Sequence, residues 1–461
     1  MLDVMRGHED EVLNLAFSPE RGGQYGRSYL ASSSRDGTIR LWQINNDVRP
    51  LKHENRLYDV TFHPKGKVLA ASGRGRISLW RLQDYKDLGR VFVYKNNKSL
   101  DILSVHYSPN GDLLAAGDAE GNITLWKHPV DQYQPLGSQA NQAEKKPYKQ
   151  WKNANSGASN GDKTTSPEIA VVRFHPNSQI IAAGSVDGTV RFWDTQGMFL
   201  GHQDTGRQDY GVTSLDFSRD GKYLVVSTSP RLAENALTES HRSGSGEIEV
   251  YEVKVDKKTL QVSLRQLSKI DESTQGSHQE SILTVVINPA NSNEFASGGE
   301  DGQIKIWNIE GRLIKTLHSH NSEAENNNKN RITRVDYSKD GQLLVSSHED
   351  GTIKFWNLST SRMISSLKRH ERQVAKVVFN PIDSTMLASA GFDAQVLIWT
   401  IPNNFQDNPL QKLVAKGCLS ADKYLALEES DSDKSFSNKD EEDIRAYCQN
   451  NPIVKKLLNL K

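Results

Sequence analysis

The chain lacks most of the features that mark secreted and membrane-spanning proteins. Only two of its 461 residues are cysteine, Cys418 and Cys448, which is too few for a disulfide framework and favours a reducing compartment. No apolar run approaches the roughly 20 residues that a transmembrane helix needs, and no signal-peptide pattern opens the chain. These absences predict a cytoplasmic protein that makes no membrane contact.

A net charge is missing as well. Lysine and arginine together number 57, aspartate and glutamate together number 57, and the formal net charge is zero. Proteins that coat nucleic acid or anionic membranes carry an excess of positive charge. The balance therefore disfavours nucleic acid as a partner, although it leaves room for a local basic patch.

The chain carries no motif of phosphate or metal chemistry. It has no Gly-x-x-x-x-Gly-Lys-Ser/Thr loop, which excludes a P-loop NTPase domain within it. Cys418 and Cys448 have no further ligand at metal-binding spacing, and the acidic run 428–433 lacks the glycine turn and terminal glutamate of a calcium loop. We therefore expect no catalytic residue, no cofactor and no metal.

What the chain does have is a repeat. The segment 30–42 reads as an apolar strand, an Asp-Gly turn and an alternating strand that ends on Trp42, which is the pattern of a β-hairpin. Close copies end on Trp193, Trp307 and Trp356. Because each unit can bury its apolar face only against a neighbouring unit, such a repeat determines the fold.

Eight of these hairpins can be counted. They close on Trp42, Trp80, Trp126, Trp193, Tyr251, Trp307, Trp356 and Trp399. The shortest spacing, 38 residues from Trp42 to Trp80, is close to the period of a propeller blade, and the longer ones indicate insertions. Further strands precede and follow the hairpins, which gives four strands per unit. The sequence predicts an all-β fold, a β-propeller of eight four-stranded blades.

The repeat resembles the WD40 family over about residues 1–400. The shared features are the Gly7-His8 opening, the aspartate six residues before the tryptophan, and the tryptophan itself. In that family a histidine, a strand serine, the turn aspartate and the tryptophan form a hydrogen-bonded tetrad within each blade. The positions that match this structural tetrad are His8, Ser34 (or Ser32), Asp36 and Trp42; Asp187 and Trp193; His278, Asp301 and Trp307; His320, Asp350 and Trp356; and His370, Asp393 and Trp399.

Three repeats depart from the tetrad pattern. Arg74 stands at the aspartate position of the second repeat, Glu120 at that of the third, and the fifth closes on Tyr251. A buried aspartate needs donors to compensate its charge. We expect the three blades that lack this network to be less stable than the others.

The sequence places the propeller at residues 1–402 and a C-terminal extension or cap, partly helical, at 403–461. Three insertions interrupt the propeller, at 132–167, 229–246 and 319–330. The first is too polar to pack and is expected to be a disordered loop.

Both ends of the chain offer a strand that could complete a blade. Residues 2–8 read as the end of an outer strand, and so do residues 409–416. Either one strand is displaced or the chain is part of something longer, so the choice between seven and eight closed blades stays open. The segments around Cys418 and Cys448 resemble the tail of cyanobacterial-type WD-repeat proteins, in which the propeller often follows a NACHT-like signalling NTPase and acts as its sensor.

The resemblance also implies a binding surface. WD40 propellers commonly hold partners on the rim of the central channel, at positions just after the start of the inner strand and just before the turn aspartate. Here those positions are Leu13, Arg35, Tyr58, Leu103, Val186, Leu283, Glu300, Arg331, Glu349 and Phe392. Their large apolar and arginine side chains are typical of interaction hot spots, although packing beneath neighbouring loops would explain them as well.

Two classes of function follow. The first is a non-catalytic scaffold that binds other proteins or peptides, in particular as the sensor part of a signalling or defence system. The alternative is a hydrolase-like propeller enzyme with an active site at the channel mouth. The rim positions show no acid–base pair that breaks the repeat, which favours the scaffold, and fold resemblance alone does not decide between the two.

Overall fold

The computed structural model describes residues 12–17, 29–34, 39–43, 49–52, 56–82, 86–92, 94–95, 98–127, 147–152, 167–207, 209–230, 244–318, 330–383 and 386–400. Side chains are described for residue 51 and for 56–82, 100–127, 147–152, 167–207, 209–230, 244–317, 330–383 and 386–399. The chain divides into two compact units, Val48–Trp399 and Met1–Asp47 with Thr400–Lys461. Each unit is treated by itself.

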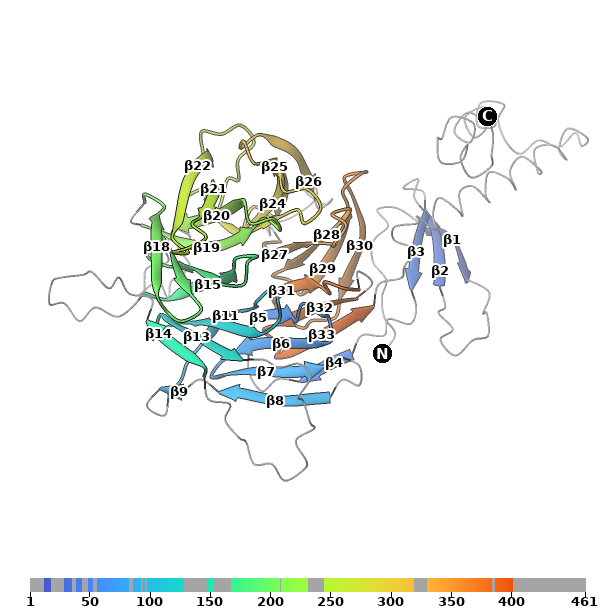
Figure 1. Ribbon diagram of the computed structural model, residues 1–461. Helices are drawn as coiled ribbons and strands as arrows, with labels where there is room; N and C mark the ends of the chain where they lie inside the picture. The colour runs from blue at the N-terminus through green and yellow to red at the C-terminus, as the bar shows by residue number, and fades with distance from the viewer. Residues whose placement is uncertain are drawn as a thin grey trace, which may run out of the picture. The chain divides into compact units, whose positions relative to one another are not determined.

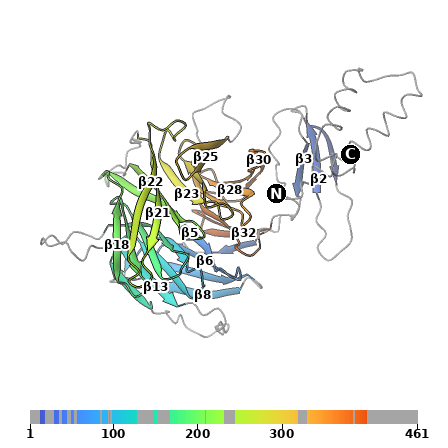
Figure 2. The same ribbon diagram turned by 45° about the horizontal axis from the view of Figure 1, so that its top comes forward.

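The larger unit consists of seven four-stranded antiparallel sheets, the blades, arranged in a closed ring (Figures 1 and 2). The innermost strand of each blade contacts the innermost strands of the two neighbouring blades all the way round. Blades 1 to 4 contain the following strands: β5 Leu57–Phe62, β6 Val68–Gly73, β7 Arg76–Arg81 and β8 Lys86–Phe92; β11 Ile102–Tyr107, β12 Leu113–Asp118, β13 Asn122–Lys127 and β14 Lys149–Lys152; β15 Ile169–Phe174, β16 Ile180–Ser185, β17 Thr189–Asp194 and β18 Phe199–Asp204; β19 Tyr210–Phe217, β20 Tyr223–Pro230, β21 Glu247–Val255 and β22 Val262–Ile270.

Blades 5 to 7 complete the ring. Their strands are β23 Ile282–Ile287, β24 Glu294–Gly299, β25 Gln303–Asn308 and β26 Leu313–His318; β27 Ile332–Tyr337, β28 Leu343–His348, β29 Thr352–Asn357 and β30 Arg362–Lys368; β31 Val374–Phe379, β32 Met386–Gly391, β33 Gln395–Thr400 and β4 Arg49–Lys52. A short pair, β9 Tyr94–Lys95 and β10 Lys98–Ser99, follows blade 1.

The hydrophobic core lies between the blades. The second and third strands of each blade are buried along most of their length, because both faces of the sheet are covered by neighbouring blades. One core cluster joins Ala296 and Ile306 of blade 5 to Val335, Leu344 and Trp356 of blade 6. Burial therefore depends on stacking of the blades, as the repeat predicts.

The ring closes with a strand from the start of the chain. Strand β4 pairs antiparallel with β33, so that Leu51 lies opposite Val396 and both belong to the core shared by blades 7 and 1. The prediction of eight blades is therefore wrong, since the structure has seven. Strand β4 follows the first hairpin in sequence but is the outer strand of the last blade in the structure. The two terminal segments that were expected to compete for a blade, 2–8 and 409–416, lie outside the described residues.

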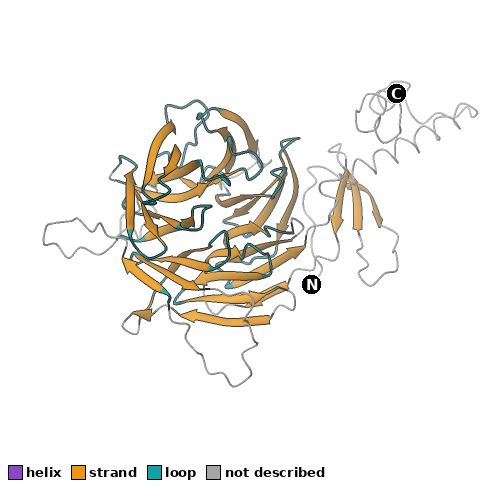
Figure 3. Ribbon diagram, in the orientation of Figure 1, coloured by secondary structure: helices purple, strands orange, loops and turns teal. Residues whose placement is uncertain are grey.

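The smaller unit contains the rest of the first repeat. Strands β1 Val12–Phe17, β2 Tyr29–Ser34 and β3 Ile39–Gln43 form a three-stranded antiparallel sheet. The expected partly helical extension at 403–461 gains no support: the described residues form strands and turns but no helix (Figure 3), and 401–461 lie outside them. Within the described ranges, no helix has the length and apolarity needed to cross a membrane.

The structure of the first insertion differs from what the sequence predicts. It was expected to be a disordered loop over 132–167, yet β14 lies within it and forms the outer strand of blade 2, with Trp151 opposite Ile123. Trp151 packs 6.1 Å from Trp193 of blade 3, ring centre to ring centre. This polar segment therefore contains a strand that pairs with β13 and packs an aromatic side chain on the next blade. The centres of the other two insertions, 231–243 and 319–329, lie outside the described residues.

Candidate interaction site on the propeller rim

Blades 5 and 7 contain complete tetrads. In blade 5, His278 Nδ1 lies 2.9 Å from an Asp301 carboxylate oxygen, and its Nε2 lies 2.7 Å from Ser297 Oγ. Trp307 Nε1 donates to the same serine at 2.8 Å. Burial is the largest single influence and would raise the pKa of Asp301, but the hydrogen bonds from His278 and the Gln303 backbone, together with the nearby positive charges, outweigh it, and the pKa lies below its usual value.

The tetrad of blade 7 repeats this geometry. His370 lies 2.9 Å from Asp393 and 2.7 Å from Ser389 Oγ, to which Trp399 donates at 2.8 Å. The side chains of His8, Ser34, Asp36 and Trp42 lie outside the described residues. These networks hold strands together within a blade and are structural.

Blades 3 and 6 use other partners at the same positions. Asp187 pairs with Arg191 at 2.8 Å in place of a histidine. In blade 6 the ring beside Ser346 belongs to His348, whose Nε2 lies 2.9 Å from the serine Oγ, while Asp350 accepts from Thr352. The predicted His320 lies outside the described residues.

Blade 4 replaces the tetrad with a tyrosine and a carboxylate. The Tyr251 hydroxyl donates to Glu249, and both side chains are buried. Glu247, two residues earlier on the same face, pairs with Arg207 at 2.7 Å and with Lys269 at 2.8 Å. The fifth repeat thus departs from the family pattern but keeps its buried charges paired.

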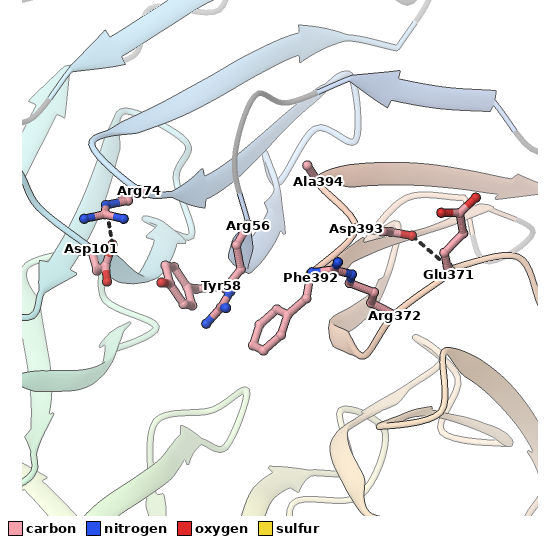
Figure 4. A pocket seen from close by; sticks show the side chains of 9 residues that line it. All are labelled: Arg56, Tyr58, Arg74, Asp101, Glu371, Arg372, Phe392, Asp393 and Ala394. Carbon is pink, nitrogen blue, oxygen red and sulfur yellow. Dashed lines mark hydrogen bonds and ion pairs between the residues drawn. The ribbon is translucent and has the colours of Figure 1, made fainter. Parts of the chain in front are cut away.

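The structure brings two of the predicted rim residues together at the seam between blades 7 and 1. The ring centres of Tyr58 and Phe392 lie 6.1 Å apart, with the rings edge to face at 77° (Figure 4). The Arg56 guanidinium carbon lies 4.7 Å from the centre of the Phe392 ring. All three side chains line one pocket with a volume of about 650 Å³.

The remaining wall of this rim pocket is charged. Its other lining residues are Arg74, Asp101, Glu371, Arg372, Asp393 and Ala394. Burial and the neighbouring Asp101, with which its hydroxyl forms a hydrogen bond, raise the pKa of Tyr58. The hydroxyl therefore keeps its proton at neutral pH, and the pocket combines two aromatic rings with three guanidinium groups.

Three other predicted rim residues form an ion network between blades 5 and 6. Arg331 pairs with Glu300 and lies 3.6 Å from Glu349. The charged side chains of this part of the rim pair with one another, so fewer of them are available to bind a ligand. Of the other predicted rim residues, Leu103, Val186 and Leu283 are partly buried and lie apart from the rim pocket, and the side chains of Leu13 and Arg35 lie outside the described residues.

Sequence reasoning missed a set of charged side chains on the inner strands. Asp59 and Lys376 are buried and pair at 2.5 Å between blades 1 and 7. Asp216 and Asp336 each accept a backbone N–H of the next inner strand, at 2.9 and 2.8 Å. Burial raises the pKa of Asp216 to about 6 and that of Asp336 to about 7. The signal that could have found them is a charged residue within an inner strand: it stands at the third position for Asp59 and Lys376, at the fifth for Asp336 and at the seventh for Asp216.

The described side chains include no cluster of three or more histidine, cysteine, aspartate or glutamate residues that could hold a metal ion. In the rim pocket, Asp393 is bound to His370, and Asp101 interacts with Tyr58 and Arg74. The chemistry that the pocket offers is stacking, apolar contact and donation from guanidinium groups.

Two family models match the chain. The family described as "WD domain, G-beta repeat" matches residues 1–43, 47–81, 90–127, 161–194, 196–230 and 271–308. The family described as "Anaphase-promoting complex subunit 4 WD40 domain" matches residues 295–381. The second segment matched by the repeat family, residues 47–81, contains β4 together with β5, β6 and β7 of blade 1. In sequence β4 thus belongs to the same repeat as blade 1, whereas in the structure it pairs with β33 of blade 7.

Three curated proteins are similar to parts of this chain, and this chain spans only 16% of the first one's own length. Periodic tryptophan protein 2 of Saccharomyces cerevisiae is 32% identical over 28% of this chain and 16% of its own length. A guanine nucleotide-binding protein subunit beta-like protein of Encephalitozoon cuniculi is 26% identical over 49% of this chain and 68% of its own length. The ribosome biogenesis protein WDR12 homolog of Chlamydomonas reinhardtii is 23% identical over 64% of this chain and 63% of its own length.

Proposed function

Because this chain belongs to the WD40-repeat family, we propose that its propeller is a non-catalytic platform that binds other proteins through the rim pocket between blades 7 and 1. The observation that supports this most is the pairing of Tyr58 with Phe392 under the Arg56 guanidinium. Aromatic and arginine side chains at the centre of a pocket are the groups that dominate binding energy at protein interfaces.

The surrounding fold suits a rigid platform. The inner strands are bonded to their neighbours around the ring, so the rim presents its side chains from fixed positions. A pre-formed surface loses little conformational entropy on binding. Partner proteins or peptides are the ligands that such a surface accommodates.

The non-catalytic part of this proposal is supported by the state of two of the three carboxylates that line the pocket. Asp393 lies 2.9 Å from His370 Nδ1 and belongs to the structural tetrad of blade 7. Asp101 lies beside Arg74 and the Tyr58 hydroxyl. Neither is placed as a free general base, which argues against the hydrolase alternative.

The test is capture of partners from the native host by tagged full-length protein. The variant Tyr58→Ala with Phe392→Ala should lose the captured partner, because both rings leave the pocket. We expect the melting temperature to stay within a few degrees of the wild type, since both side chains are only partly buried. Equal capture by wild type and variant, or a large fall in melting temperature, would contradict the proposal.

As the setting of this platform we propose the sensor part of a signalling or defence system. Its support is the resemblance of the segments around Cys418 and Cys448 to tails of NACHT-associated propellers, and these segments lie outside the described residues. A NACHT-type NTPase among the captured partners would support this setting. Capture of ribosome-assembly factors alone would contradict it.

A further inference from the structure

Three guanidinium groups gather around the two aromatic rings of the rim pocket (Figure 4). We propose that this pocket selects protein segments in which an acidic side chain stands next to an aromatic or aliphatic one. The carboxylate would bind Arg56 and Arg372, and its apolar neighbour would pack on Tyr58 and Phe392. This inference rests on the proposed function and specifies the ligand of the same site.

Arg56 is poised to bind a carboxylate. Its guanidinium carbon lies 4.7 Å from the centre of the Phe392 ring, so the ring holds the side chain by a cation–π contact. Stacking uses the flat face of a guanidinium and leaves the N–H groups at its edge available. Among the described residues, no carboxylate forms an ion pair with Arg56 or with Arg372.

The third guanidinium is held loosely. Arg74 Nε lies 3.9 Å from Asp101 Oδ1, and the two side chains are 65% and 38% exposed. Exposed pairs at this distance contribute little and are easily rearranged. Arg74 can therefore turn towards an anionic ligand without a large loss.

The acidic side chains of the pocket do not cancel this positive charge at its centre. Asp393 Oδ2 lies 2.9 Å from His370 Nδ1 and also accepts the Glu371 backbone N–H at 3.0 Å, so this carboxylate is committed to its own blade. The Glu371 carboxylate points away from the two rings (Figure 4). A ligand carboxylate would therefore meet guanidinium groups first.

The apolar part of the ligand follows from the rings. Tyr58 and Phe392 stand edge to face at 77°, and Arg56 lies between them (Figure 4), so the pocket offers aromatic carbon surface beside a guanidinium group. Such surfaces favour a further aromatic or branched aliphatic side chain. A charged side chain without an apolar neighbour would leave this surface exposed to water, so the two features are required together.

A random peptide library displayed against the full-length protein tests the proposal. Peptides that carry Asp or Glu beside Phe, Tyr, Leu or Ile should be enriched. For an enriched peptide, replacing its Glu by Gln should weaken binding by about ten- to a hundredfold, because a charge-assisted hydrogen bond is lost. The variant Arg56→Gln with Arg372→Gln should bind the Glu and Gln peptides equally.

Arg312→Gln is the matched control, since Arg312 is an exposed arginine on blade 5 outside the pocket. It should keep the wild-type preference. Enriched peptides without acidic residues that still require Phe392 would overturn the carboxylate inference and leave the proposed function standing. No enrichment that depends on Tyr58 and Phe392, or equal competition by a single-stranded oligonucleotide, would overturn both.

Discussion

Whether the tryptophan indole N–H at the end of a blade's third strand has a hydrogen-bond acceptor depends on one residue of the second strand. In blades 5, 6 and 7 that residue is Ser297, Ser346 or Ser389, and its hydroxyl accepts the indole hydrogen at 2.8–2.9 Å. Blades 2 and 3 have Ala116 and Ala183 at the matching place. The N–H groups of Trp126 and Trp193 are buried there without an acceptor among the described residues.

This difference predicts a stabilising substitution. Ala183→Ser should place a hydroxyl within reach of Trp193 Nε1 and raise the free energy of unfolding by about 1 kcal/mol, the usual contribution of one buried hydrogen bond. Urea unfolding monitored by tryptophan fluorescence measures it. Ala182→Ser is the control, because Ala182 is equally buried but points to the opposite face. A lower stability for Ala183→Ser than for the wild type would contradict the prediction.

The inner-strand aspartates predict a dependence of stability on pH. Burial raises the pKa of Asp336 to about 7, whereas the unfolded chain has the usual value near 4. The folded state therefore holds a proton that the unfolded state releases. This contribution to stability is complete below about pH 4 and is lost as the pH rises through about 7.

Asp336→Asn tests that sign. The amide oxygen can still accept the Phe379 N–H, which the carboxylate accepts at 2.8 Å, but it carries no charge. At pH 8.5 the variant should be more stable than the wild type by roughly 2–4 kcal/mol, and at pH 4 the two should be equal. Asp340→Asn is the control, because blade 2 has Asn110 at the corresponding turn position. Its free energy of unfolding should match that of the wild type at both pH values. A less stable Asp336→Asn at pH 8.5 would show that a paired charge is needed there.

At the scale of the strand, local patterns determined most of what the sequence could predict. Alternation, the Asp-Gly turns and the terminal aromatic residues located the second and third strands in all eight repeats. In blade 6 the predicted His320 lies outside the described residues, and the sequence pattern did not single out His348 of the second strand, whose ring lies beside Ser346. Strand β14 was missed as well, because local patterns do not show the contact of Trp151 with Trp193 on the next blade.

The candidate site shows the same limit. The family pattern placed Tyr58 and Phe392 on the rim, but their meeting depends on which blades are neighbours. In a ring of eight, the first repeat would separate the last blade from the blade that carries Tyr58. In the structure the ring closes without the first repeat, so β31 contacts β5 directly and the two rings lie 6.1 Å apart.

We expect the closed ring to depend on the four-residue strand β4. Strand β4 covers the outer edge of β33 and buries Leu51 against Val396 and Ile398. Without it, blade 7 would have three strands and an open edge, and the seam that carries the rim pocket would lose its support. Outer strands of the other blades have partners close in sequence, so this is the one closure among the described blades that joins distant parts of the chain.

Two truncated chains separate the role of β4 from that of the first repeat. A chain of residues 48–461 keeps β4 and should unfold with the wild-type midpoint in urea, because Val48–Trp399 forms a compact unit. A chain of residues 54–461 differs by six residues and lacks β4. It loses the buried Leu51 side chain, which alone contributes roughly 2–5 kcal/mol, as well as the backbone hydrogen bonds to β33. We expect a much lower midpoint and no binding of the acidic peptides. If residues 54–461 were as stable as 48–461, another segment would have to close the ring, and the pocket at the seam would not depend on β4.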